Sequence, residues 1–117
     1  MALVAVRVLV AIEPNMYREV LAFHISQQRP KSEVVLASRQ TLRAEAKRTR
    51  PHLIIANEVP AELREKMGFF FWVALRTDDG LDADIKANGH STTIRDVSLE
   101  DLVALVDKAE EEFSHAQ

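Results

Sequence analysis

The sequence has no cysteine and only three glycines, Gly68, Gly80 and Gly89, among its 117 residues. Without cysteine the chain cannot form disulfides, Cys-ligated zinc or iron–sulfur sites, or a thiol nucleophile. The three glycines are far apart, so they cannot build a glycine-rich phosphate-binding loop. These absences exclude several enzyme classes and agree with a reducing compartment.

An excess of one charge and long apolar runs are also missing. The 15 basic and 18 acidic residues leave a formal charge of −3, which argues against a general nucleic-acid-binding surface. Residues 2–12 are apolar apart from Arg7, but this stretch is too short to span a membrane and does not resemble a signal peptide. We therefore expect a soluble, cytoplasmic single domain over residues 1–117, without membrane contact.

Five short segments have the pattern of β-strands. Residues 4–11, 52–56 and 69–75 are apolar on both faces, which is typical of strands covered on both sides of a sheet. Residues 33–37 form a shorter apolar strand, and the polar content of 91–95 suits the edge of a sheet.

The segments between and after these strands carry helix signals. The clearest helix signal lies in the last segment, where Ser98 and Asp101 form a variant capping box and apolar residues recur on one face. In the first, two rows at helical spacing predict the helix; they are Met16, Val20 and Phe23, and Tyr17, Leu21 and His24. The region after the fourth strand is polar and has only weak helical periodicity. The predicted helices cover residues 14–28, 39–49, 61–67, 78–88 and 98–113.

Strands that alternate with helices predict an α/β fold with a parallel five-stranded sheet in the order 2-1-3-4-5. This order puts the three most apolar strands inside. Ligands of such sheets bind past the carboxyl ends of the strands, between the first and third strands. That position is occupied by Ala11, Ile12 and Glu13 from one strand and by Asn57 and Glu58 from the other.

Three segments resemble, in their order and spacing, the motifs of response-regulator receiver domains. They are VRVLVAIEP at 6–14, PHLIIAN at 51–57 and RDVSLEDLVALV at 95–106. The resemblance implies a flavodoxin-like (βα)5 three-layer sandwich. It also implies a role in signal transduction, within a two-component phosphorelay.

This sequence departs from the family at each position that carries its chemistry. Receiver domains transfer a phosphoryl group to an aspartate, using acidic residues that hold Mg²⁺, a hydroxyl residue and a lysine. The resemblance places the phosphoacceptor at Asn57 and the acidic pocket at Ala11, Ile12 and Glu13. It places the hydroxyl residue at Ala74 or Leu75, the aromatic switch residue at Thr92, the lysine at Arg95 and the next proline at Asp96.

The change at Asn57 decides the chemistry. A carboxamide is not a nucleophile at neutral pH, so Asn57 cannot form an acyl phosphate, and its neutral oxygen would hold Mg²⁺ weakly. Ala11 and Ile12 supply no oxygen ligand, and Glu13 occupies a position that is usually not a ligand in the family. We therefore expect a degenerate receiver, or pseudo-receiver, that is not an enzyme and has no catalytic residue, metal or cofactor.

Two functions follow from this interpretation. The first is a non-phosphorylatable signalling module that acts by protein–protein interaction or dimerisation. By resemblance, its surface would combine the fourth helix, fifth strand and fifth helix, at 78–88, 91–95 and the exposed side of 98–113. The alternative is a small-ligand sensor whose cleft is lined by Ala11, Ile12, Asn57 and Leu75, because loss of the acidic residues favours an uncharged ligand.

Two further features have a functional and a structural interpretation. The aromatic run at 69–72 could be a stacking platform, but we favour a buried central strand. Five basic residues against one glutamate over 39–50 could bind an acidic partner or nucleic acid, but we favour a solvated helix face. The four histidines lack the spacing of a metal site.

Overall fold

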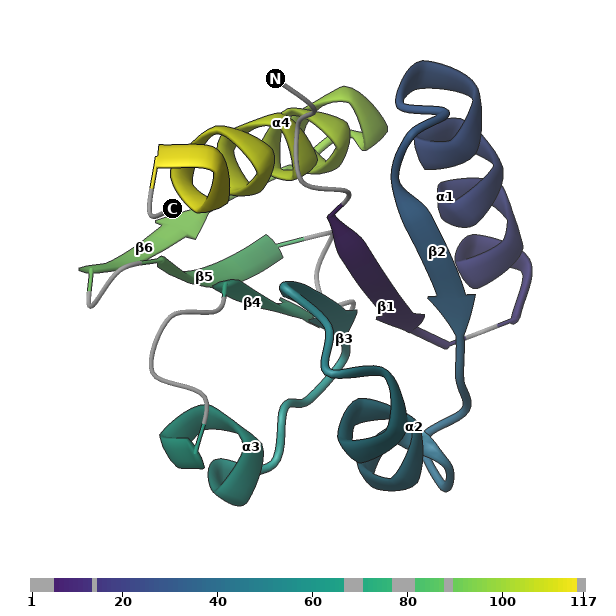
Figure 1. The fold of residues 1–117 in the computed structure, drawn as a ribbon, viewed down its shortest axis with the longest axis vertical. Helices are drawn as coiled ribbons and strands as arrows, with labels where there is room; N and C mark the ends of the chain where they lie inside the picture. The colour runs from purple at the N-terminus through teal and green to yellow at the C-terminus, as the bar shows by residue number, and fades with distance from the viewer. Residues whose placement is uncertain (1–5, 14, 67–70, 77–81, 88–89, 116–117) are drawn as a thin grey trace.

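A computed structural model describes residues 6–13, 15–66, 71–76, 82–87 and 90–115. It shows a six-stranded sheet between two pairs of helices (Figure 1). The strands are β1 (Arg7–Ala11), β2 (Glu33–Leu36), β3 (Leu53–Ala56), β4 (Phe71–Arg76), β5 (Asp82–Ala87) and β6 (His90–Ile94). The helices are α1 (Asn15–Gln28), α2 (Leu42–Thr49), α3 (Ala61–Lys66) and α4 (Leu99–His115).

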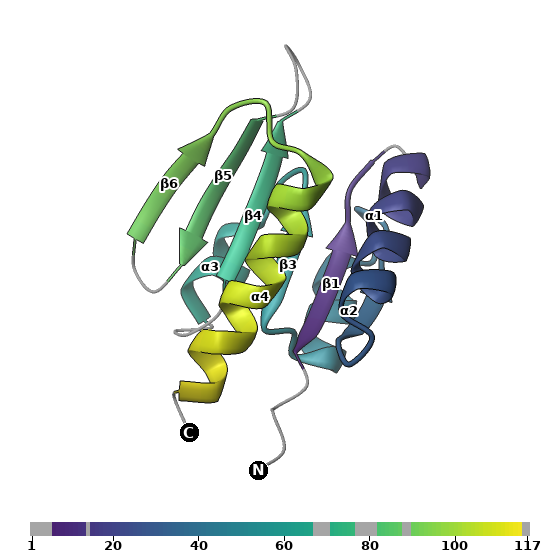
Figure 2. The same cartoon turned by 90° about the horizontal axis from the view of Figure 1, so that it is seen from above.

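The sheet is mixed and has the order β2-β1-β3-β4-β5-β6. β2, β1, β3 and β4 are parallel. β4, β5 and β6 form an antiparallel meander (Figure 2). The predicted order of the first four strands and the edge position of 91–95 are confirmed. The prediction of a parallel five-stranded, flavodoxin-like (βα)5 sandwich is wrong.

The error lies in the segment predicted as a helix over 78–88. The part of it that the structure describes, Asp82–Ala87, is strand β5. Its inward side chains Ala83 and Ile85 are buried, while Asp84 and Lys86, which alternate with them, are half-buried on the opposite face. A segment that alternates apolar and polar residues can bury its apolar residues on one face as a strand, but not as a helix.

The outward side of the meander is held by polar contacts between neighbouring strands. Asp84 on β5 accepts a hydrogen bond from the Thr93 hydroxyl on β6 at 2.9 Å and from the Arg76 guanidinium on β4 at 3.2 Å. Such cross-strand pairs stabilise a sheet modestly and fix its register. They give Asp84 a structural role.

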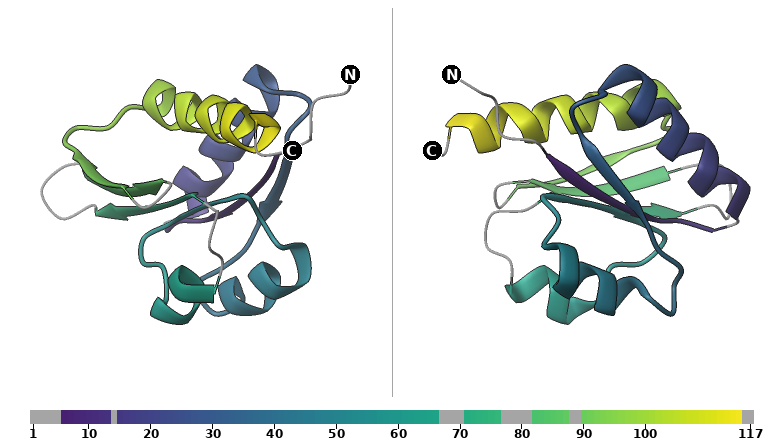
Figure 3. Two further views of the ribbon diagram at one scale, coloured as in Figure 1. Left: turned by 60° about the vertical axis from the view of Figure 1, so that its left-hand side comes forward. Right: turned by 45° about the vertical axis from the view of Figure 1, so that its right-hand side comes forward.

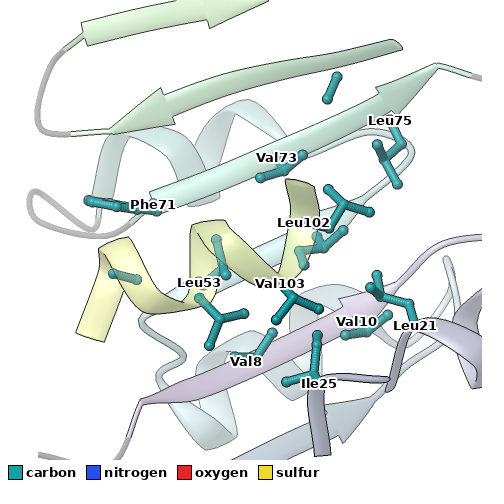
Figure 4. Close-up of a cluster of buried hydrophobic side chains, with 14 of the residues drawn as sticks. Val8, Val10, Leu21, Ile25, Leu53, Phe71, Val73, Leu75, Leu102 and Val103 are labelled. Carbon is teal, nitrogen blue, oxygen red and sulfur yellow. The ribbon is translucent and has the colours of Figure 1, made fainter. Parts of the chain in front are cut away.

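The core has two parts, one on each face of the sheet. α1 and α4 cover one face and α2 and α3 the other, as Figure 3 shows. Strand neighbours alternate between the faces: Val8 and Val10 lie in the cluster under α1 and α4, and Leu9 lies in the cluster under α2 and α3. Figure 4 shows the first cluster, in which Leu102 of α4 lies among side chains of the central strands.

The central strands β1 and β3 are buried on both faces, as predicted from their apolar runs. On β4, Phe71 is buried and Trp72 is half-buried on the other face, so the described part of the aromatic run is a central strand and not an open platform. Phe69 and Phe70 lie outside the described residues.

The ends of two helices show how local sequence sets the fold. Ser98 and Asp101 exchange backbone-to-side-chain hydrogen bonds of 2.9 and 3.1 Å at the start of α4, which confirms the predicted capping box. At the end of α2, the Arg7 guanidinium donates to the carbonyl oxygens of Thr49 and Arg50 at 2.8 and 3.1 Å. A cation is favourable there because the carbonyls of a helix C-terminus lack partners.

α1 and α4 lie on the same face and are joined at one end by an ion pair. Arg29, just after α1, holds both carboxylate oxygens of Asp107 on α4. These hydrogen bonds hold the pKa of the Asp107 carboxyl below its usual range, with burial acting in the opposite direction.

In the described part of the chain, no helix combines the length and the apolar character needed to cross a bilayer.

The two faces of β5 provide a test of the strand assignment. We expect Ile85→Ala to lower the free energy of unfolding by about 2–4 kcal/mol, because it removes buried methyl groups from the core. Lys86→Ala is the matched control on the opposite face and should change it by less than about 0.5 kcal/mol. Urea denaturation measures both values, and equal effects would contradict the strand.

Candidate functional site

The carboxyl ends of β1 and β3 meet at one edge of the sheet, where the side chain of Asn57 binds the backbone of Glu13. The Asn57 Oδ1 accepts the Glu13 N–H at 2.7 Å, and its Nδ2 donates to the Glu13 carbonyl oxygen at 3.4 Å. The strands are in register there, with Ala11 opposite Ala56. Asn57 thus fixes the chain between β1 and α1 onto the end of β3.

This pairing needs a carboxamide. The amide group supplies an acceptor and a donor at once, which an ionised carboxylate cannot do. An aspartate at position 57 would place a negative oxygen next to the Glu13 carbonyl oxygen. The position that resembles the phosphoacceptor of receiver domains therefore has a structural explanation for its asparagine.

A pocket of about 290 Å³ lies next to this pairing, between the strand ends and the first turns of α1 and α4. Its walls are mainly aliphatic and aromatic, with Glu13 as the one ionisable carboxylate among the residues that line it. The lining residues are Ile12, Glu13, Met16, Tyr17, Val20, Leu21, Asn57, Leu75, Leu99 and Leu102.

The chemistry of the pocket follows from these walls. Ile12, Leu75 and Leu102 are almost completely buried and form part of the core under α1 and α4. Both polar functions of the Asn57 amide take part in hydrogen bonds to Glu13. The pocket therefore offers apolar contact to a ligand and few polar partners for a charged group.

Three of the four residues predicted to line the cleft do so: Ile12, Asn57 and Leu75. Ala11 does not, because it lies in the cluster under α2 and α3, on the opposite face of β1 from Ile12. Of the two residues considered for the fourth strand, Leu75 reaches the pocket, and Ala74 lies on the other face.

The remaining predicted positions lie away from the pocket. Thr92 and Arg95 are exposed, on β6 and just after it. Because β5 lies between β4 and β6, β6 is three strand positions from β3, or about 14 Å at the usual strand spacing. The predicted five-stranded order would have placed the strand with Thr92 one position nearer to the strand that ends at Asn57. The structure therefore does not bring Thr92 and Arg95 together with Asn57.

Sequence reasoning missed the residues that α1 and α4 contribute to the pocket. Met16, Tyr17 and Val20 belong to the two rows at helical spacing and are exposed, whereas Leu21 of the same rows and Ile25 face the core. The sequence does contain a signal for this contribution, which is the width of the apolar surface of α1. Two apolar rows on one helix exceed what a single packed face requires.

The charged surfaces noted in the sequence are partly neutralised. On α2, Arg48 pairs with Glu45, and Arg43 pairs with Glu62 of α3. In both pairs the arginine is well exposed, and exposed pairs of this kind contribute little to stability. Among the described residues, no three His, Asp or Glu side chains are grouped so that they could hold a metal ion.

His52 lies at the opposite end of β1 and β3 and is tied to Arg7. The Arg7 N–H donates to the imidazole Nδ1 at 3.0 Å, and the His52 N–H donates to the Arg7 carbonyl oxygen at 2.9 Å. Burial lowers the pKa of His52, and the Arg7 charge lowers it further, while Glu33 opposes the shift. His52 is therefore a structural residue in its neutral form.

Comparisons with known proteins found no match to this chain. No protein-family model matches it, and neither does any curated protein or solved structure. The resemblance to receiver domains therefore depends on the three sequence segments alone.

The carboxamide at position 57 can be tested directly. We expect Asn57→Asp to lower the free energy of unfolding by about 1–2 kcal/mol at pH 7, because it removes the Nδ2 donor and sets a carboxylate beside a carbonyl oxygen. Chemical denaturation gives the value. The exposed neighbour Glu58 provides the control Glu58→Gln, which should stay within about 0.5 kcal/mol of the unchanged protein. Full stability of the Asn57→Asp variant would contradict this role.

His52 predicts a pH dependence of stability. Its pKa is lower in the folded than in the unfolded chain, so the unfolded chain binds more protons as pH falls below about 6.5. Stability should therefore decrease as pH falls through this range. His52→Asn keeps an acceptor for the Arg7 N–H but does not titrate, so its unfolding free energy should depend less on pH between about 6.5 and 5. Identical pH profiles would exclude this contribution.

Proposed function

We propose that this protein is a binding module whose pocket at the carboxyl ends of β1, β3 and β4 takes an uncharged, mainly apolar small molecule. The observation that carries the proposal is the pocket itself, which is about 290 Å³ in volume and is lined almost entirely by apolar side chains. This volume is close to the lower end of the range for ligand sites in proteins. A cytoplasmic location is part of the same proposal.

The size and walls of the pocket limit the ligand. A cavity of about 150 Å³ holds a benzene molecule, so a pocket twice as large suits a two-ring aromatic compound or a branched chain of similar size. The apolar walls favour neutral over anionic ligands, because an anion would lose its hydration without gaining a polar partner. Met16 adds a flexible wall that can adapt to ligand shape.

The same features speak against phosphoryl transfer at this site. Asn57 lacks a nucleophilic oxygen, and its amide is paired with the Glu13 backbone. Ile12 and Leu75 put apolar groups where a phosphoryl group would need charge neutralisation. We therefore propose a binding role without catalysis.

A protein-interaction role is the second candidate, and a different observation favours it. Phe23 does not line the pocket, yet 62% of its surface is exposed. The interaction surface expected from the resemblance is not supported in its original form, because the described part of its fourth helix is strand β5. The exposed surface of α1 is the better candidate.

Binding can be tested with two probes that differ in charge, naphthol and naphthalenesulfonate. We expect naphthol to shift NMR signals of the residues lining the pocket, and to bind at least about tenfold more tightly than the sulfonate, which corresponds to about 1.4 kcal/mol. Equal binding of both probes, or signal changes spread over the surface, would contradict a defined apolar site.

Two tryptophan substitutions make the test specific. Val20 lines the pocket and Leu36 on β2 does not, although their exposed fractions are similar, at 41% and 46%. Val20→Trp should fill the mouth of the pocket and abolish naphthol binding, whereas Leu36→Trp should leave it unchanged. Retention of binding in the first variant would overturn the proposed site.

A further inference from the structure

α1 carries most of the exposed apolar surface in the described part of the chain. Four of the five large apolar side chains that are exposed there belong to this helix, and Met16 and Phe23 are the most exposed, at 64% and 62%. Apolar surface gathered on one element in this way marks an interaction site more often than isolated exposed residues do.

The exposed residues form one seam along the helix. Met16, Val20 and Phe23 follow one another at intervals of four and three residues, the spacing of a helix–helix packing seam. Leu21 and Ile25 face the core, so the seam lies on the solvent side of α1, with Met16 and Val20 also at the mouth of the pocket. In Figure 2, α1 lies at the outside of the molecule.

We propose that the seam packs against the α1 seam of a second copy of this chain, with the two helices antiparallel about a twofold axis at Val20. In this arrangement Met16 meets the partner's Phe23, and Val20 meets the partner's Val20. The contact is isologous, as in most dimers, and a thioether beside an aromatic ring is favourable.

The residues beside the seam fit the same arrangement. Tyr17 and His24 are seven residues apart on the side of the seam that faces α4, since Tyr17 also lines the pocket and His24 lies in the groove between α1 and α4. Twofold symmetry brings the Tyr17 hydroxyl near the partner's His24 imidazole, which can accept its proton in a hydrogen bond. A second copy therefore matches both the apolar seam and this polar flank.

One residue opposes the contact and makes it testable. Glu19 is exposed on the other flank, and the same symmetry brings it near the partner's Glu19. Two short helices also bury less than a standard interface. We therefore expect a weak dimer that becomes tighter at high salt, which screens the repulsion between the two carboxylates.

The experiment is sedimentation equilibrium of the full chain, from about 10 µM to about 1 mM, the range in which weak complexes dissociate. The unchanged protein should dimerise. Phe23→Glu should be monomeric, and Glu19→Gln should dimerise about two- to threefold more tightly, because it removes the like-charge pair. Leu36→Glu is the control for a charge at a similarly exposed site outside the seam and should dimerise normally.

Each other result counts against the proposal. A monomer at about 1 mM would overturn it, and so would a dimer that neither Phe23→Glu nor Glu19→Gln changes. Because Phe23 is exposed, Phe23→Glu should keep the denaturation midpoint of the unchanged protein. Met16 and Val20 belong to both the pocket and the seam, whereas Phe23 does not line the pocket. A monomeric Phe23→Glu variant should therefore still bind naphthol, and loss of naphthol binding in this monomer would count against the pocket and not against the dimer.

Discussion

The two hydrogen bonds between the Asn57 side chain and the Glu13 backbone fix the edge of the sheet at which the pocket lies. They join the ends of β1 and β3 at the point where the chain turns into α1. Ile12, the residue before Glu13, is thereby held as a wall of the pocket, and the first turn of α1 supplies the mouth. Each hydrogen bond contributes only about 1 kcal/mol, but their position decides where the pocket lies.

Part of the fold could be predicted because local sequence and tertiary environment agree. β1 and β3 are apolar on both faces and are covered on both faces, and the Ser98–Asp101 capping box begins α4 as expected. The prediction of a helix over 78–88 is wrong for 82–87, because its acidic residues suit the first turn of a helix but its apolar residues recur with the period of a strand. Asp82, Asp84 and Lys86 alternate with apolar residues, and Asn88-Gly89, which follows, is the residue pair typical of a two-residue hairpin.

The candidate site could be predicted only where it depends on strand ends. Ile12, Asn57 and Leu75 were located correctly, since the ends of parallel strands fall at one edge of the sheet. Ala11 was not, because the phase of β1 decides which of two neighbours faces the pocket. The contribution of α1 could not be predicted either. Its apolar rows are of similar strength, and only tertiary packing selects Leu21 and Ile25 for the core.

The sheet has an antiparallel half and a parallel half, and the two differ in the length of the connections between paired strands. β5 and β6 are separated by only two residues, and β4 and β5 by five, whereas each parallel pair requires a crossover that includes a helix. Closing a short loop costs less conformational entropy than closing a long one. The meander can therefore form before β1, β2 and β3 are aligned, and it offers β3 an existing edge on which the parallel half of the sheet can assemble.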